Sequence, residues 1–302
     1  MCYIFLLSFI FTPSWGWNTK GHVLISQIAF DHLSRTEQST VNHYAERIAK
    51  HLPVYLEQQL DDRYRGAALF AKLTVLPDFW RGITLKNLFQ RFDASLPEVL
   101  QPYRQQTTDR WHFEDRPFPR KKCVFPKNFQ LFAAIATLQK AFHQTNNENS
   151  KALILLLLTH FIEDAHQPLH TFTKVNKYCH NDRGGNDYPI RMGKRKISNL
   201  HKTWDAGVGY LNRPFHFKTR SEQLQQEFAK SSLKTDIARL DPIAWVNAND
   251  AYATLIYSIK PHHSLTPSYY QQGQAIARLQ ITIAGYRVAA IFKSIRKGVA
   301  LH

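Results

Sequence analysis

The stretch from Thr159 to His170 reads THFIEDAHQPLH and follows the apolar run KALILLLL. If it forms a helix that stops at Pro168, His160 and Asp164 lie four residues apart on one face and can reach one ion. His170 follows the proline, where the chain leaves the helix and can turn back to the same point. Because uncompensated charge is costly in a core, the stretch indicates either a hydrogen-bonded core histidine or a metal site.

The same pairing of histidine and aspartate recurs along the chain. His201 and Asp205 are again four residues apart in SNLHKTWDAG, and His112 precedes Asp115 in DRWHFED. One four-coordinate zinc ion cannot use so many ligands, so we infer a multinuclear metal site. Its candidate ligands, counting the α-amine of a processed N-terminus, are Trp17, His22, Asp78, His112, Asp115, His160, Asp164, His170, His201 and Asp205.

Residues 1–16, MCYIFLLSFIFTPSWG, predict a secretory signal peptide, although no Lys or Arg stands at their start. The apolar run 3–11 is shorter than the about 20 residues that a spanning helix needs. Cleavage after Gly16 would make Trp17 the new N-terminus and free its amine for a metal. We therefore expect an exported protein, secreted or periplasmic, without stable membrane insertion.

The mature segment 17–302 predicts one mainly α-helical (all-α) domain. Glycine is scarce, at 12 residues, and nothing marks an internal linker. Apolar residues recur with helical period in 23–33, 129–142, 152–162, 244–257 and 275–292. The exception lies within 181–198, where a Gly-Gly turn and the alternation in DYPIRMGKRKI predict a short β-hairpin near 184–198.

The chain is strongly basic, with 39 Lys and Arg against 23 Asp and Glu and a net charge of +16. Such a charge favours polyanionic partners. The basic residues are dispersed, with clusters at 120–122 and 191–196, and most such clusters are solvated surface. Charge by itself therefore does not separate nucleic acid from anionic lipid or a cell-wall polymer.

Three cysteines are present, and Cys2 belongs to the predicted signal. Cys123 and Cys179 can pair in an oxidising compartment, or remain as buried thiols. Neither lies in a CxxC spacing, so the metal ligands are expected to be His and Asp.

The motif HFIEDAHQPLH, followed by RGGND and NLHKTWD, resembles the zinc-dependent nucleases of the S1/P1 type. The resemblance runs from Trp17 to the AGYRVAAIF segment around Gly285. It implies a mainly helical fold, like that of phospholipase C and P1 nuclease, and three zinc ions (Zn²⁺) per chain. By that resemblance Asp78, His112, His160 and Asp164 hold the first zinc. Asp164 bridges to a second, held by His22 and Trp17, and His170, His201 and Asp205 hold the third.

The resemblance also implies an activity. It predicts metal-assisted hydrolysis of single-stranded DNA and RNA to 5′-phosphorylated products, with 3′-nucleotides as further substrates and no obligate protein partner. Besides the bridging Asp164, Arg81 and Asp115 match the helpers near the scissile phosphate. Phe113 and Asn186 match the base pocket, as a stacking face and an amide. A core phenylalanine and a turn asparagine are the alternative for these two.

Two segments are longer than the resemblance leads us to expect. Residues 79–111 separate Asp78 from His112, and this insertion could fold over the cleft and narrow the substrate range. The segment FTKVNKYCHNDR also looks long, and a Cys123 to Cys179 bridge would tether it beside the site.

Two other functions compete with this interpretation. Zinc-dependent phospholipase C is similar in fold and also uses an N-terminal tryptophan. The short spacing from Trp17 to His22, an aspartate at Asp205 and the GGN turn favour the nuclease. The second competing function is that of a secreted, basic protein that binds polyanions without catalysis. Such a protein would not need so many candidate metal ligands.

Overall fold

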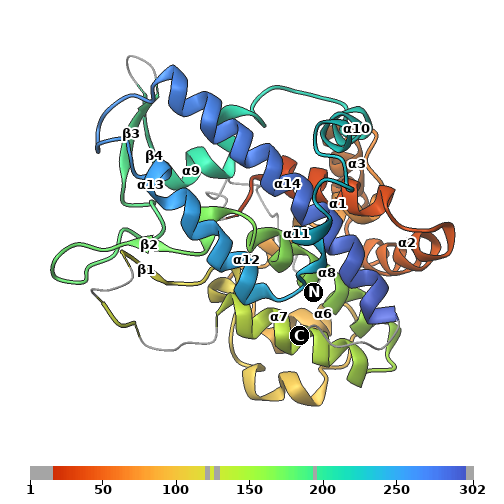
Figure 1. Ribbon diagram of the computed structural model, residues 1–302. Coiled ribbons are helices and arrows are strands. Elements are labelled where there is room, and N and C mark those ends of the chain that lie inside the picture. The colour runs from red at the N-terminus through yellow and green to blue at the C-terminus, as the bar shows by residue number, and fades with distance from the viewer. Residues whose placement is uncertain (1–15, 120–122, 126–129, 193–195, 297–302) are drawn as a thin grey trace.

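The computed structural model describes residues 16–119, 123–125, 130–192 and 196–296 (Figure 1). The predicted mainly helical fold with a small sheet is confirmed. The α-helices are α1 Thr19–Asp31, α2 Arg35–Ala49, α3 Val54–Arg63, α4 Leu69–Leu73, α5 Leu76–Phe79, α6 Leu85–Arg91, α7 Leu131–Gln144, α8 Glu148–Asp164, α9 Leu200–Asp205, α10 Phe217–Glu227, α11 Lys234–Ala238, α12 Pro242–Asn249, α13 Ala253–Ile256 and α14 Pro267–Arg296.

Short elements connect these helices. The 3-10 helices are η1 Glu98–Tyr103, η2 Asp109–His112, η3 Pro168–His170, η4 Gly207–Gly209 and η5 Asp250–Tyr252. The strands are β1 Pro117–Phe118, β2 Thr173–Lys174, β3 Pro189–Met192 and β4 Lys196–Asn199. Residues 1–15 of the predicted signal peptide lie outside the described residues, and so does the basic cluster at 120–122.

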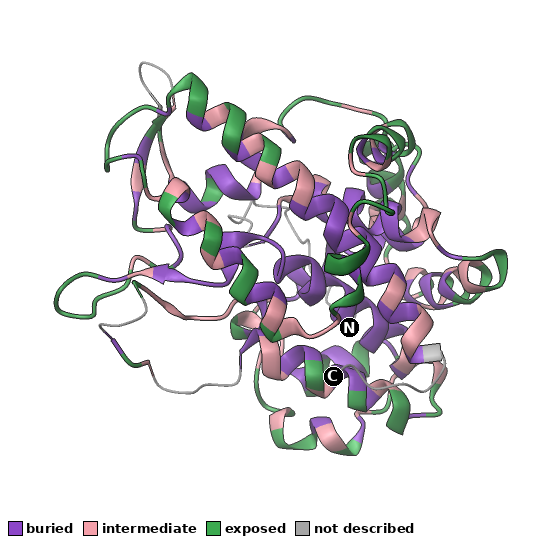
Figure 2. Cartoon of the chain, in the orientation of Figure 1, coloured by how far each residue is buried: buried purple, intermediate pink, exposed green. Residues whose placement is uncertain are grey.

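Helix α8 is the centre of the fold, and every residue from Ala152 to Asp164 is buried (Figure 2). Asn147 caps its start by accepting a hydrogen bond from Ser150 N. The helix ends at Asp164, not at the predicted Pro168. The residue before a proline is biased to extended backbone, and Gln167 has φ −86° and ψ 114°, so the last turn cannot continue into the proline.

The predicted helical pattern at 244–257 forms two short helices, α12 and α13, joined by η5. The buried Asn249 explains the break, because its side-chain amide donates to Ala165 O and to Thr171 Oγ1, both at 3.1 Å. The chain is thereby tied to the segment that follows α8.

The predicted hairpin is confirmed, with β3 and β4 antiparallel and Ile190 opposite Ser198. A second, parallel pair joins β1 to β2. Next to it, Cys123 and Cys179 form a disulfide with a Cα–Cα distance of 5.5 Å. The pairing left open by the sequence is therefore present, and it tethers the long segment after His170.

The insertion at 79–111 could have covered the cleft, but most of it runs elsewhere. Its middle packs at the start of α8, where Ser150 Oγ donates to Ser95 O at 2.7 Å and Asn149 Nδ2 donates to Asp93 O. Ser150 and Asp164 are about 21 Å apart along a helix that rises 1.5 Å per residue. Apolar residues such as Leu88 and Leu100 are fully buried, so the insertion adds to the core at the far end.

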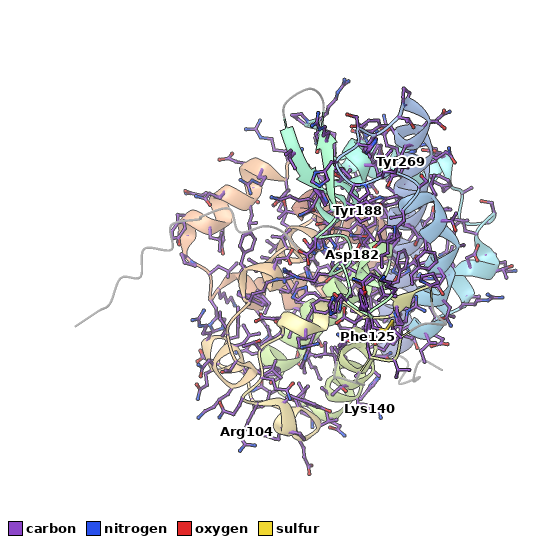
Figure 3. All side chains as sticks on the ribbon, turned by 90° about the vertical axis from the view of Figure 1, so that its left-hand side faces the viewer. Arg104, Phe125, Lys140, Asp182, Tyr188 and Tyr269 are labelled. Atoms are coloured by element: carbon purple, nitrogen blue, oxygen red, sulfur yellow. A yellow bond between two sulfur atoms is a disulfide. The ribbon has the colours of Figure 1, made fainter. Side chains whose placement is uncertain are left out.

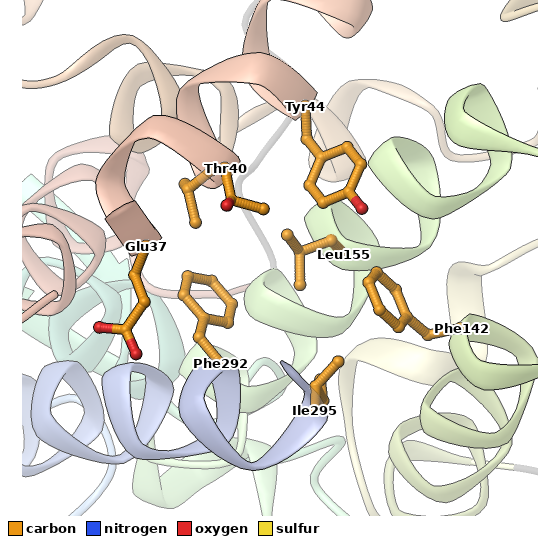
Figure 4. A pocket seen from close by; sticks show the side chains of 8 residues that line it. Glu37, Thr40, Tyr44, Phe142, Leu155, Phe292 and Ile295 are labelled. Carbon is orange, nitrogen blue, oxygen red and sulfur yellow. The ribbon is translucent and has the colours of Figure 1, made fainter. Parts of the chain in front are cut away.

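An apolar pocket of about 110 Å³ opens between α2, α7, α8 and α14 (Figure 4). Among the described residues that line it, Glu37 is the only charged one. Phosphate recognition needs cations or N–H donors, so this pocket is not a candidate for phosphodiester chemistry. Its lining residues are Glu37, Thr40, Val41, Tyr44, Phe142, Leu155, Phe292 and Ile295.

The long helix α14 crosses the molecule beside α1 and α8 (Figure 1). By length and composition its residues 267–295 are apolar enough to cross a membrane, but 72% of the most apolar window is buried inside the protein. It therefore packs as a core helix. A Cβ built at Gly285 would lie 2.6 Å from Ile28 Cβ and 2.9 Å from Ile25 O of α1.

Gly285→Ala is expected to destabilise the protein by about 1–3 kcal/mol, because the added methyl group overpacks the contact between α14 and α1. Urea unfolding followed by circular dichroism measures the change. Gln271→Ala on the exposed face of the same helix is the control and should leave the midpoint within error. Equal stability of Gly285→Ala and wild type would show that the two helices can separate without cost.

Candidate active site

Eight buried side chains converge at the C-terminal end of α8 from six elements. His160 and Asp164 come from α8 itself, and His170 follows on η3. Helices α1, α5 and α9 and the 3-10 helix η2 supply the others. These are His22, Asp78, His112, His201 and Asp205, and all eight are at most 9% exposed.

The ligand-type atoms form three adjoining groups. The groups are His22 with His160 and Asp164, then Asp78 with His112 and His160, then His170 with His201 and Asp205, and the atoms in each lie within 4.8 Å of one another. In a tetrahedral site with bonds of 2.0–2.1 Å, two ligand atoms are about 3.3 Å apart. Little adjustment would therefore bring each group around an ion.

Asp164 faces two of these centres at once. Its Oδ2 lies 2.9 Å from His112 Nδ1 and 3.3 Å from His160 Nε2, and its Oδ1 lies 3.6 Å from His22 Nε2. The carboxylate is completely buried, and this burial raises the pKa of Asp164 to about 7. A bridging position between two cations would offset that burial.

Backbone carbonyls orient three of the histidines. Nδ1 of His160 donates to Thr74 O at 2.7 Å, that of His170 to His112 O at 2.6 Å, and that of His201 to Gly184 O at 2.7 Å. A carbonyl can only accept, so the proton sits on Nδ1 and Nε2 turns inward with its lone pair. These three candidate ligands therefore have a fixed tautomer.

The residues present fit a set of divalent metal ions. Several ligand-type atoms are buried and make no hydrogen bond within the described part of the chain. Among them are His22 Nε2, His170 Nε2, Asp164 Oδ1, Asp78 Oδ2 and Asp205 Oδ2. Burial lowers the pKa of His22 and His170 well below the usual range, which keeps them neutral, as metal ligands must be. Neutral imidazoles and carboxylates are the ligands zinc takes.

The segment before α1 also enters the site. Trp17 is completely buried, and its Nε1 donates to Glu163 O at 3.1 Å. A Cβ at Gly16 would overlap Asp164 Oδ1 and lie 3.0 Å from His22 Nε2. The peptide bond between Gly16 and Trp17 is therefore next to two candidate ligands, where an α-amine at Trp17 would be in reach of the same ion.

Glu163 is a site residue that the sequence reasoning missed. It is completely buried, and Oε2 accepts from His22 Nδ1 at 2.7 Å while Oε1 accepts from Ser26 Oγ. His22 is thus held by a carboxylate, which fixes the proton on Nδ1. A glutamate in an otherwise apolar stretch beside Asp164 was the signal that could have revealed it.

Gln167 has a similar role for Asp205 and was also missed. Its Nε2 donates to Asp205 Oδ1 at 2.7 Å, and its Oε1 accepts from Leu169 N at 2.6 Å. Both the nitrogen and the oxygen of the Gln167 amide are hydrogen-bonded, so the side chain has one orientation. Asp205 is thereby held with Oδ1 at 3.9 Å from His170 Nε2 and at 3.6 Å from His201 Nε2.

The two proposed helpers lie at the rim. Arg81 Nη2 is 3.2 Å from Asp78 Oδ1, so its guanidinium is beside the metal-ligand cluster. Asp115 is held by Gln130, whose Nε2 donates to Asp115 Oδ2 at 2.9 Å. A second arginine, Arg110, has Nη2 at 3.8 Å from the same carboxylate oxygen.

The two candidate base-pocket residues are placed differently. Phe113 follows His112 in extended backbone and is half-buried, so part of its ring reaches solvent beside the ligands. Asn186 donates from Nδ2 to Arg183 O at 2.9 Å, as a turn asparagine does. Its turn needs Gly184, because φ is +60° and a Cβ there would lie 2.5 Å from Leu169 O. This hydrogen bond uses one of the two N–H donors of the Asn186 amide, so its second N–H and its side-chain oxygen are still able to meet a base.

Comparison with known proteins agrees with this site. The family model described as S1/P1 Nuclease matches residues 17–297. Endonuclease 1 of Arabidopsis thaliana is 23% identical over 299 residues, which cover 93% of this chain and 87% of that protein. Endonuclease 4 of Arabidopsis thaliana is 26% identical over 186 residues, 57% of this chain and 58% of that protein.

Glu163→Gln is expected to weaken one metal site about 10- to 100-fold, the usual effect of losing a group that orients a ligating histidine. The amide keeps the volume but can no longer accept from both His22 and Ser26. Metal content at increasing chelator concentration measures the loss. Ser26→Ala, which removes only the second hydrogen bond, is the matched control and should retain more metal. Equal retention in Glu163→Gln and wild type would contradict the role.

Proposed function

The chain belongs to the S1/P1 nuclease family and is a nuclease, and on that premise we propose that it is an exported enzyme with three zinc ions that hydrolyses single-stranded DNA and RNA. The observation that carries the proposal is the set of three adjoining His and Asp groups, two of which share His160. Three cations would balance the carboxylates that the fold buries there.

The ligands divide naturally among three ions. Asp78, His112, His160 and Asp164 would hold the first, Asp164, His22 and the Trp17 α-amine the second, and His170, His201 and Asp205 the third. When bound, such ions activate water for attack on phosphorus and withdraw charge from phosphate oxygens. The distances of 2.9 Å and 3.6 Å from the two oxygens of Asp164 to His112 and His22 support its role as the bridge.

The remaining residues would position the substrate. Arg81 stands beside Asp78, where a guanidinium can donate two hydrogen bonds to a phosphate. Asp115, held by Gln130, is partly exposed and would accept a hydrogen bond from the substrate. Phe113 presents a partly exposed ring for base stacking, and Asn186 an oxygen for a base edge.

Such contacts favour unpaired strands. A base can reach Phe113 only after it has left its stack, which costs a few kcal/mol in a duplex and much less in a single strand. A small 3′-nucleotide needs no unstacking and presents the same phosphate. We therefore include 3′-nucleotidase activity in the proposed function.

Two features support the proposed export. The predicted signal in residues 1–16 would be removed after Gly16, and the Cys123 to Cys179 disulfide suits an oxidising compartment. Processing would at the same time free the amine of Trp17 beside Asp164 and His22. Secretion and completion of the site would thus be coupled.

The purified mature protein is expected to contain three zinc ions, and chelation should remove both activity and much of the stability, because buried ligands that converge couple metal binding to folding. Elemental analysis and thermal unfolding with and without chelator measure this. Restoring zinc should recover activity. One zinc or none in active enzyme would contradict the three-ion proposal.

The whole activity can be tested on three substrates. Hydrolysis of single-stranded DNA, RNA and phosphatidylcholine is compared with and without a chelator. We expect chelator-sensitive cleavage of both nucleic acids and little or no cleavage of the lipid. Preferential release of phospholipid head groups would favour a phospholipase C instead.

An uncleaved signal or an N-terminal tag on Trp17 should abolish activity while the helical fold persists. The extension converts the amine into an amide, and position 16 has no room for a side chain beside Asp164. Activity and circular dichroism are compared for the mature chain and for a version that begins with an added Met-Ala pair. Full activity of the extended chain would refute the role of the amine.

Digestion products should carry 5′-phosphates, because attack by water on phosphorus with departure of the 3′-oxygen leaves the phosphate on the 5′ side. Chromatography of a digest of single-stranded DNA identifies the ends. Products with 3′-phosphates or 2′,3′-cyclic phosphates would exclude the proposed direction of cleavage.

Phe113→Ala should raise KM more than it lowers kcat, since it removes binding of the base.

A further inference from the structure

Two exposed side chains stand next to the candidate ligands without a role so far. Phe79 follows Asp78 at the end of α5 and is 40% exposed, although its neighbour is a buried carboxylate. Arg110 precedes His112 by two residues on η2, and 58% of its side chain is exposed. Both segments therefore emerge from the site directly into solvent.

A hydrogen bond fixes these two segments side by side. Gly82 N donates to Asp109 Oδ1 at 2.9 Å, which joins the turn after α5 to the residue before Arg110. The bridge between Thr84 and Thr107 continues the contact. Residues about 30 positions apart in the chain thus form one rim of the site.

The charges along this rim suit a phosphodiester chain. Arg81 Nη2 lies 3.2 Å from Asp78 Oδ1. Arg110 Nη2 lies 3.8 Å from Asp115 Oδ2, a distance that leaves the exposed guanidinium able to turn to another anion. Proteins that bind single strands combine such cations with exposed rings on which successive bases stack.

We propose that Phe79 and Arg110 form a subsite for a nucleotide that flanks the scissile phosphate. Phe79 stacks on its base, and Arg110 binds its phosphate. This inference rests on the proposed nuclease function and deepens it, because the subsite gives the enzyme a preference for chains over single nucleotides. It is distinct from the candidate base pocket at Phe113 and Asn186.

Substrate length makes the subsite measurable. A 3′-nucleotide carries one base and the phosphate to be removed, so it does not extend to a flanking position. A single-stranded oligonucleotide of ten residues does. The ratio of KM for the oligonucleotide to KM for the 3′-nucleotide therefore measures binding at the subsite separately from binding at the shared site.

Phe79→Ala is expected to raise this ratio about 5- to 10-fold, the lower range for the loss of base stacking on an aromatic side chain. Phe79→Trp keeps a stacking face and should restore the wild-type ratio. Arg110→Ala should also raise the ratio and should lower the slope of log KM against log salt by about 0.7, one phosphate contact on a single strand.

Matched controls come from exposed residues elsewhere. Arg104→Ala removes an exposed arginine of the same insertion that lies at the edge of the molecule (Figure 3). Tyr55→Ala removes a 45% exposed ring on α3. Neither should change the ratio or the salt slope.

The possible results separate the two levels of inference. An unchanged ratio in active Phe79→Ala and Arg110→Ala overturns the subsite and leaves the nuclease proposal intact. An equal rise of both KM values also overturns it, because the defect would then lie at the shared site. A wild-type enzyme that hydrolyses neither substrate overturns the proposed function and the subsite with it.

Discussion

The structure depends on the burial of charge at one end of an apolar helix. Helix α8 is buried throughout its last thirteen residues and ends in His160, Glu163 and Asp164, none of which reaches solvent. Buried ionisable groups are stable only with partners of opposite charge or with hydrogen bonds. His22 and Ser26 of α1 supply such partners to Glu163, His112 supplies one to Asp164, and Thr74 supplies one to His160.

The partners form two layers with different tasks. The inner layer is made of imidazole nitrogens and carboxylate oxygens that face one another at 2.9–3.9 Å. The outer layer consists of backbone carbonyls, Glu163 and Gln167, which accept or donate the hydrogen bonds that fix each ring and carboxylate. Because the outer groups are themselves buried, the inner set is arranged before any ion or substrate binds, and reorganisation upon binding is small.

The periphery of the molecule is built on the same scaffold but serves other needs. The apolar residues of the insertion at 79–111 pack into the core near the start of α8. Its two ends lie beside the site. Those ends carry Phe79, Arg81 and Arg110. The disulfide at Cys179 tethers the segment that leads from His170 to the glycine turn. The proposed contacts to a polyanion thus lie on the two ends of this insertion, in keeping with the net charge of +16.

The sequence by itself determined what depends on short-range geometry. The helical class, the hairpin and the i to i+4 pairing of His160 with Asp164 and of His201 with Asp205 follow from helix and turn geometry. The residue types also limited which side chains are candidate metal ligands, because few side chains bind zinc. Tertiary structure alone decided which distant groups meet: His22 with Glu163, Asp205 with Gln167, Cys123 with Cys179, and the course of 79–111. Such contacts are set by how helices pack, and no local pattern of residues encodes that packing.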